Sequence, residues 1–202
     1  MALIKHGNNA LSSVTALPSA IPTGKPVLLS TATASSSSSI EFTSGIDSTY
    51  DIYQFEMINI HAATSGAEWQ FNLSTDSGSN YNVTKTSTAF ESYHTEADGA
   101  WGLTYQAAGD HAQGTGDQQL YRNMSTDNDG SFSGYLTLFN PSSDTYVKHW
   151  VSRGNGFNVT PTSIDWYSAG YGNTTSAINA IKFVMSSGNI DAGTIKMYGI
   201  SA

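Results

Sequence analysis

The chain has 202 residues, of which 39% are hydrophobic and 11% aromatic, enough for one β domain of ordinary to large size with a sizeable core. Its formal net charge is −8 without any cluster of basic residues, which argues against sequence-independent binding of nucleic acid, because such binding needs Lys and Arg to displace counterions from phosphates. The absence of Cys excludes disulfides, thiolate catalysis and the common structural zinc sites.

The N-terminal segment differs from the rest of the chain. Residues 1–38 are rich in small residues, contain three Pro residues and end in a run of Ser. We predict an extended N-terminal arm over residues 1–38 and a single domain over residues 39–202. Within the arm, Lys25–Ala34 could form a strand that pairs at a sheet edge or on a neighbouring subunit, since Pro keeps it from being a central strand. The alternative is a terminus that orders only partly.

From residue 39 onward, strand-like runs alternate with turn residues, and no segment has helical periodicity. We therefore predict an all-β fold, an antiparallel jelly-roll β-sandwich of about 8–10 strands. The predicted strands are Ile40–Ser44, Tyr50–Ala62, Ala67–Ser74, Asn82–Thr95, Gly102–Ala107, Phe132–Phe139, Tyr146–Arg153, Ser163–Tyr167, Ala177–Met185 and Thr194–Ile200.

Two of these runs have informative alternation. One face of the second run carries Tyr53, Phe55 and Met57, and the other carries Ile52, Ile58 and Ile60, a pattern that predicts a strand covered on both sides. The third run places Trp69, Phe71 and Leu73 on one face and Gln70 and Asn72 on the other, which predicts a half-buried strand.

The last two runs, Ala180–Met185 and Thr194–Ile200, flank a segment rich in Gly, Ser and Asn. Because Gly and Asn tolerate positive φ, this segment predicts a closing β-hairpin.

Two similar octets, Ser74–Tyr81 and Ser125–Phe132, place Asp and Gly just before an aromatic residue. The first resembles the Asp-box of sialidases, which stabilises a hairpin and is not catalytic. A sialidase also needs three arginines, and this chain has only Arg122 and Arg153. We interpret both octets as hairpin turns, in which an Asp side chain accepts hydrogen bonds from turn amides.

Two groups of residues are candidate metal sites. Asp127–Gly130 offers oxygen ligands for calcium, but in EF-hand register Leu136 stands where a bidentate Glu is required. His94 and Glu96 share one strand face and Asp98 follows, but no second His is placed beside them. We predict no metal site and no cofactor.

The sequence offers no positive indication of catalysis. The five Glu residues lack the spacing of jelly-roll glycosidases, and no nucleophile elbow or phosphate-binding loop is present. We predict no catalytic residue and expect that the protein is not an enzyme.

Aromatic residues gather in the second half of the chain and could stack on sugars or anchor a protein interface, the alternative being core packing. Residues 165–175, which mix aromatics with Gly and Thr, form the best candidate for an exposed loop. The aromatic candidates are Trp101, Tyr105, Trp150, Trp166, Tyr167 and Tyr171.

Four segments carry a family resemblance over about residues 40–201: IEFTSGIDSTYDIYQFEMINIHAAT, AFESYHTEADGAWGLTYQ, SGYLTLFNPSSDTYVKHW and SSGNIDAGTIKMYGIS. They resemble β-rich structural proteins of marine tailed phages. The resemblance implies a protein of the virion, such as a capsid decoration or cement protein, or a fibre or tail component.

The function expected from the sequence is a virion structural protein on the capsid exterior. It would be assembled in the host cytoplasm, as a homo-oligomer such as a trimer, and bind the major capsid protein or other virion proteins through subunit contacts and its arm. The alternative is a carbohydrate- or receptor-binding fibre or tail module, with host surface glycans as ligands. No nucleic-acid partner and no membrane span are expected.

Overall fold

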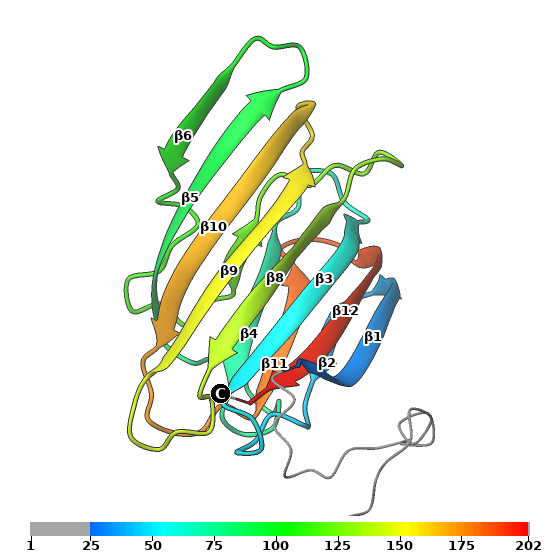
Figure 1. Ribbon diagram of the computed structural model, residues 1–202. Helices are drawn as coiled ribbons and strands as arrows, with labels where there is room; N and C mark the ends of the chain where they lie inside the picture. Colours follow the sequence, from blue (N-terminus) through cyan, green and yellow to red (C-terminus); the bar gives the residue numbers. More distant parts are fainter. Residues whose placement is uncertain (1–24, 202) are drawn as a thin grey trace, which may run out of the picture.

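The computed structural model describes residues 25–201, which form two antiparallel β-sheets (Figure 1). In spatial order, the large sheet contains β1 (Val27–Ser37), β12 (Ile190–Ile200), β3 (Ile52–Ala62), β8 (Phe132–Phe139), β9 (Lys148–Phe157), β10 (Thr162–Gly172), β5 (Lys85–Thr95) and β6 (Trp101–Tyr105). The small sheet contains β2 (Ser39–Phe42), β11 (Ala180–Met185), β4 (Trp69–Ser74) and β7 (Gln118–Tyr121).

The prediction of an all-β protein with two antiparallel sheets is confirmed, and each of the ten predicted strands overlaps an observed one. The structure has twelve strands rather than 8–10, because β7 was missed and β1 was assigned to the arm. The jelly-roll winding stays a prediction. In the part of the chain that the structure describes, no helix has the length and hydrophobicity of a membrane span.

The strand expected at Lys25–Ala34 exists as β1, at one edge of the large sheet (Figure 1). It pairs antiparallel with β12 over nearly its whole length, from Val27 opposite Gly199 to Ser37 opposite Ile190. Residues 27–37 are therefore part of the sheet of the same chain. The rest of the expected arm, residues 1–24, lies outside the described residues.

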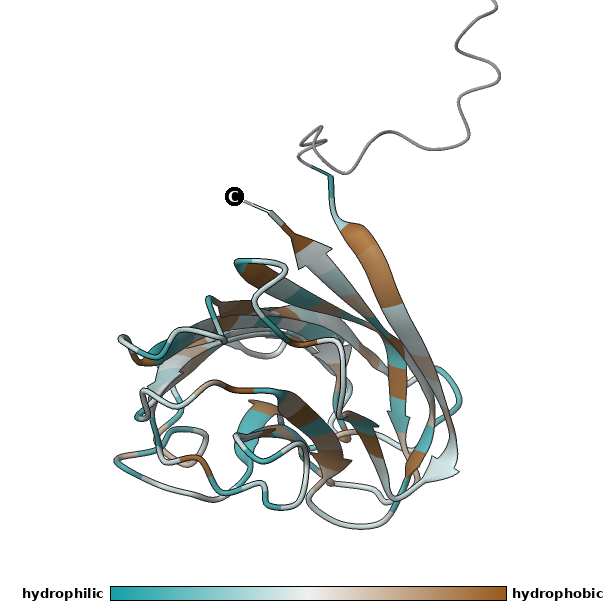
Figure 2. Cartoon of the chain, turned by 90° about the horizontal axis from the view of Figure 1, so that it is seen from below, coloured by the Kyte–Doolittle hydropathy of each residue, from teal (hydrophilic) through white to brown (hydrophobic). Residues whose placement is uncertain are grey.

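The two sheets enclose an aromatic core. The large sheet arches over the small one, as the view from below shows (Figure 2). The rings of Trp69 and Phe183 stack with centroids 5.7 Å apart, and Phe71 meets Trp150 of the large sheet edge to face at 5.0 Å. Each of these side chains is at most 1% exposed, as predicted for Trp69 and Phe71. Apolar burial of this kind stabilises a β-sandwich that has no disulfide.

The prediction that β3 is covered on both faces is wrong. Ile58 is 38% exposed, whereas Ile60 is fully buried with the opposite face of the strand. Asn59, between them, has a φ of 50°, and the pairing with β8 shifts register between Met57 and Ile60. This bulge inserts one residue and turns Ile60 into the core, so only one face of β3 is buried.

The half-buried character predicted for β4 is also wrong at one position. Trp69, Phe71 and Leu73 point into the core, as expected, but Asn72 on the other face is only 1% exposed. The segments that lead into β5 and β7 cover it, since Asn72 Nδ2 donates to the carbonyl oxygens of Tyr81 and Thr115.

The predicted closing hairpin does not form. β11 pairs with β2 and β4 in the small sheet, whereas β12 pairs with β1 and β3 in the large sheet. The turn between them carries the chain from one sheet to the other, and Ser186 N–H donates to the carbonyl of Glu68 at 2.9 Å. Gly188, with a φ of 69°, allows this crossing.

Candidate interaction surface

The outer face of the large sheet, which points away from the small sheet, carries a continuous row of side chains that we call the outer row. Cross-strand pairing places Tyr105 opposite Phe90, Phe90 opposite Tyr167, Tyr167 opposite Arg153, and Arg153 opposite Tyr135. The row therefore runs across five neighbouring strands, β6, β5, β10, β9 and β8 (Figure 1).

Close contacts hold the centre of the outer row rigid. The Phe90 and Tyr167 rings stack with centroids 4.7 Å apart and 6° between their planes. The Arg153 guanidinium lies 4.8 Å from the centroid of the Tyr167 ring. Tyr167 is thus held between an aromatic ring and a cation, and both of its ring faces are occupied.

The one charged pair in this row is neutralised locally. Arg153 donates two hydrogen bonds to Asp165, from Nε at 3.1 Å and from Nη2 at 2.8 Å, and Tyr167 Oη donates to the same carboxylate at 2.9 Å. The bonds from Arg153 lower the pKa of the Asp165 carboxyl, and the bond to Asp165 raises the pKa of Tyr167. The neighbouring Asp165 therefore balances the charge of Arg153, and the other four residues of the outer row are aromatic.

Two shallow depressions lie side by side on this face. One, of about 280 Å³, is lined by Phe90, Tyr135 and Tyr167 of the outer row. The other, of about 360 Å³, is lined by His149 and Tyr171. Both are also lined by Thr88, Val151 and Ala169.

The outer row ends at β6, a free edge of the large sheet in the described chain. This strand exposes three large side chains: Trp101 is 68% exposed, Leu103 71% and Tyr105 55%. Only one edge of β6 is paired, with β5, so its other edge presents backbone N–H and C=O groups. Apolar side chains beside an unpaired edge are typical of a surface that another strand covers.

The aromatic residues singled out from the sequence divide between core and surface. Trp150 and Trp166 are buried, so the core-packing alternative holds for both. Trp101 and Tyr105 are exposed on β6. Tyr167 and Tyr171 are half-buried on β10, and the prediction of an exposed loop over residues 165–175 is wrong, because β10 continues to Gly172.

Sequence reasoning missed Phe90, Tyr135 and Val151, which belong to the same face and are 39–40% exposed. Each lies inside a strand that was predicted, and each alternates with buried neighbours. Their alternation with small and polar residues was the available signal, but only the cross-strand register shows that they lie side by side.

The candidate metal ligands do not come together in the structure to form a metal site. His94 Nε2 lies 3.2 Å from Asp98 Oδ1, and both side chains are largely exposed. Asp127 lies in a turn in which its backbone carbonyl accepts from Gly130 N at 2.8 Å. Over residues 25–201, no group of three His, Asp or Glu side chains is placed to hold a metal ion.

The first octet forms a turn with the Asp hydrogen bonds that were predicted, but the prediction of hairpin turns is wrong for both octets. β4 and β5 lie in different sheets, as do β7 and β8, so each turn carries the chain from one sheet to the other. Asp76 accepts hydrogen bonds from Asn80 N at 2.8 Å and from Asn80 Nδ2 at 2.7 Å, and Ser74 Oγ donates to it at 2.7 Å. These bonds, led by that of the Asn80 side chain, lower the pKa of Asp76 from 3.8 to about 2.

Both arginines of the chain serve carboxylates within it. Arg153 binds Asp165, and Arg122 binds the buried Glu91 through both Nε and Nη2. Neither guanidinium is left to hold a substrate carboxylate. No family model, curated protein or solved structure matches this chain.

Proposed function

We propose that the chain is a structural protein of a virion exterior, which decorates or cements a tailed-phage capsid through contacts between its copies and with the underlying shell. The observation that carries this proposal is the β6 edge, where Trp101, Leu103 and Tyr105 are exposed beside unpaired backbone groups. Such a surface suits a protein that is completed by a neighbour. The resemblance of residues 40–201 to phage structural proteins supports the virion location.

The strand order supports a jelly-roll winding. One half of the large sheet has the order β1-β12-β3-β8, and the small sheet has the order β2-β11-β4-β7. Within these eight strands, consecutive strands of the chain alternate between the two sheets except at β4 and β7, which pair with each other in the small sheet, as in two nested Greek keys. β9, β10, β5 and β6 then extend the large sheet on one side, and this extension carries the outer row and the β6 edge.

The partner that we propose at β6 is the β1 edge of a second copy. β1 is the opposite edge of the same sheet and also exposes apolar side chains, with Val27 43% and Leu28 52% exposed. The start of β1 is coloured as hydrophobic in Figure 2. An interface between two different edges is heterologous, and such interfaces form a ring when the rotation from copy to copy closes, as the expected trimer requires.

Glycan binding is less well supported by the geometry. A sugar stacks on a free ring face, but Phe90 and Arg153 occupy both faces of Tyr167, and Trp166 is buried. His94 stacks against Trp101 at 6.1 Å. We therefore rank an assembly surface above a carbohydrate-binding or receptor-binding module.

Two variants test the edge-to-edge contact, and each of them blocks one of the two edges. Leu103→Lys places a charge on the β6 edge and Leu28→Lys places one on the β1 edge. Each variant alone is expected to be a monomer by light scattering, because every copy has lost one of the two surfaces that a ring needs. An equal mixture of the two is expected to form dimers, since one intact β6 and one intact β1 remain.

The control is Thr104→Lys, which adds the same charge to β6 at an exposed position on the opposite face of the strand. It is expected to leave the assembly intact. Wild-type protein that stays monomeric at high concentration, or saturable glycan binding that Trp101→Ala abolishes, would refute the proposed contact.

A further inference from the structure

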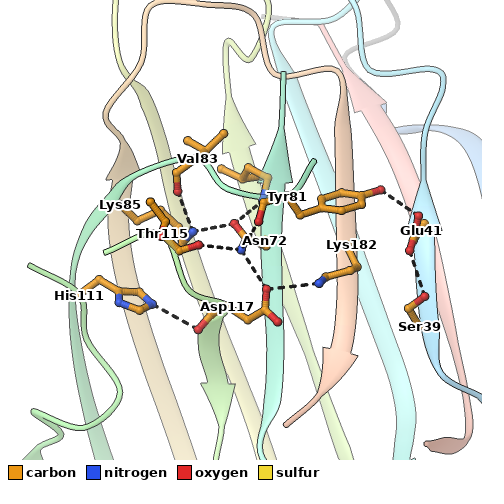
Figure 3. Close-up of polar contacts among 11 residues, drawn as sticks. Ser39, Glu41, Asn72, Tyr81, Val83, Lys85, His111, Thr115, Asp117 and Lys182 are labelled. Atoms are coloured by element: carbon orange, nitrogen blue, oxygen red, sulfur yellow. Dashed lines mark hydrogen bonds and ion pairs between the residues drawn. The ribbon is translucent and has the colours of Figure 1, made fainter. Parts of the chain in front are cut away.

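A buried lysine, an asparagine and an aspartate meet on the face of the small sheet that points away from the core, and far from the outer row (Figure 3). Lys85 is the first residue of β5 in the large sheet, and Asn72 lies on β4 in the small sheet. Lys85 is fully buried, and Asn72 is 1% exposed. Lys85 Nζ lies 2.6 Å from Asn72 Oδ1.

Burial makes the amine of Lys85 a better nucleophile than an exposed lysine. Loss of hydration lowers the pKa of Lys85 from 10.5 to about 8. Within the described chain, Nζ donates to two acceptors, Asn72 Oδ1 and the carbonyl oxygen of Val83 at 2.8 Å. A neutral amine has two N–H groups and one lone pair, so it can satisfy both acceptors and keep the lone pair for attack.

The carboxamide of Asn72 is polarised at both ends. Oδ1 accepts from the backbone N–H of Leu73 at 2.9 Å as well as from Lys85. Nδ2 has three acceptors around it: Asp117 Oδ1 at 2.9 Å, Tyr81 O at 2.9 Å and Thr115 O at 3.1 Å. These contacts fix the orientation of the amide and place a donor where negative charge would develop on Oδ1.

Asp117 is positioned to move a proton. Its Oδ1 contacts the nitrogen of Asn72 that would leave, and Lys182 Nζ lies 3.4 Å from the same oxygen. The Lys182 cation lies 5.4 Å from the centroid of the Tyr81 ring, whose hydroxyl in turn donates to Glu41. The network in Figure 3 therefore holds the carboxylate against the Asn72 amide from the solvent side.

We propose that Lys85 and Asn72 join through a side-chain amide bond that links the two sheets covalently, with Asp117 as the proton shuttle. The lone pair of Nζ attacks Cγ of Asn72, and the Leu73 N–H stabilises the negative charge on Oδ1. Asp117 passes the proton lost by Nζ to Nδ2, the Cγ–Nδ2 bond breaks, and ammonia leaves. One C–N bond forms and one breaks, so no oxidant, reductant or co-reactant is required.

The bond is tested by mass spectrometry of the full-length protein after denaturation. The wild-type chain is expected to weigh less than its sequence by the mass of one ammonia molecule. Trypsin is expected to leave the chain uncut after Lys85, and fragmentation should identify a peptide in which Lys85 and Asn72 are linked. Linkage should accelerate as the pH rises through about 8, where the Lys85 amine becomes neutral.

The chain provides its own control in the same digest. Lys148 is as fully buried as Lys85, but its Nζ contacts the backbone carbonyl oxygens of Tyr146 and Thr174, at 2.6 and 3.3 Å. Backbone carbonyls offer no amine leaving group without breaking the chain. Trypsin is therefore expected to cut after Lys148 once the protein is denatured.

Variants separate the bond from other chemistry. Lys85→Arg keeps the charge and should retain the full mass, whereas Asp117→Ala should slow the mass loss in protein that is folded by circular dichroism. Ammonia loss that persists in Lys85→Arg would indicate that Asn72 cyclises on its own backbone, and would overturn the proposal. Folded wild-type protein with its full mass and normal cleavage after Lys85 would overturn it as well.

Discussion

Asp76 fixes the turn between β4 and β5 with a single carboxylate. Its oxygens accept from the backbone and side chain of Asn80 and from Ser74. The similar octet that follows β7 is held differently: among the described residues, the hydrogen bonds of Asp127 use its backbone atoms. Two stretches that look alike in the sequence therefore depend on their Asp side chains to different degrees.

The Asp76 turn predicts a pH-dependent loss of stability. The pKa of Asp76 falls from 3.8 to about 2 on folding, so its carboxylate contributes stability above about pH 4, and this contribution is lost as the pH falls towards 2. Asp76→Ala should lower the thermal unfolding midpoint by a few degrees at neutral pH, and by less at pH 2 to 3. Asp127→Ala is the matched control and should change the midpoint little at any pH. An equal effect of both substitutions would contradict this reading.

In strand β9, two glycine positions have no room for a side chain, because buried aromatic rings lie directly on them. Gly154 and Gly156 face the core, where a Cβ at Gly154 would lie 2.3 Å from Cζ of Phe132 and one at Gly156 would lie 2.6 Å from Cζ of Tyr121. The absence of side chains lets both rings lie directly on the sheet. Any larger residue must displace a buried ring.

Gly154→Ala is therefore expected to destabilise the protein by about 1–3 kcal/mol, the usual cost of overpacking a core. The measurement is the midpoint of chemical denaturation. Gly99→Ala serves as the control, because the nearest atom to its Cβ, Thr95 Oγ1, would be 3.9 Å away. Equal midpoints for wild type and Gly154→Ala would show that Phe132 can move aside freely.

Strands with a clear alternation of apolar and polar residues could be predicted from the sequence. Features that depend on pairing between distant strands could not. The run Phe132–Phe139 matches β8 at both ends, because its alternation lies within the strand. β7 was missed because two of its four residues are Gln, which is not typical of a buried strand. Gln118 can be buried because it accepts a hydrogen bond from Ser87 Oγ and donates one to the carbonyl of Gly109, and neither partner belongs to β7. The side chain of Ile60 points into the core because β3 has a bulge in its pairing with β8, which the sequence does not indicate.

The candidate surface follows the same rule. Trp101 and Tyr105 could be named from the sequence, because aromatic residues on a short strand between turns are candidates for exposure. Phe90 could not be joined to them, since only the pairing of β5 with β6 and β10 places these side chains in one row. Lys85 and Asn72 likewise lie on different sheets, and no spacing in the sequence indicates their contact.

At the scale of the whole molecule, the distribution of surfaces suits assembly. Among the described residues, the large sheet has free edges at β1 and β6, and its outer face carries the mainly aromatic outer row, whose Arg153 is paired with Asp165. The proposed bond between Lys85 and Asn72 would join the two sheets of each copy. A covalently closed sandwich that binds its neighbours edge to edge would resist conditions outside a cell.

The residues before β1 predict a separable capsid contact. The sheet begins at Val27, so deleting residues 1–24 leaves every described strand in place. The shortened protein should fold and assemble as the wild type does, but under the proposed function it should no longer sediment with capsids of the phage proposed to encode it. Full occupancy by this shortened protein would show that residues 1–24 make no essential capsid contact.

The virion location is tested most directly by a cryo-electron microscopy map of the particles produced by that phage. The account predicts density on the capsid exterior that fits residues 25–201, with β6 of one copy beside β1 of the next. Purified infectious particles without this chain, or with the chain confined to the interior, would contradict it.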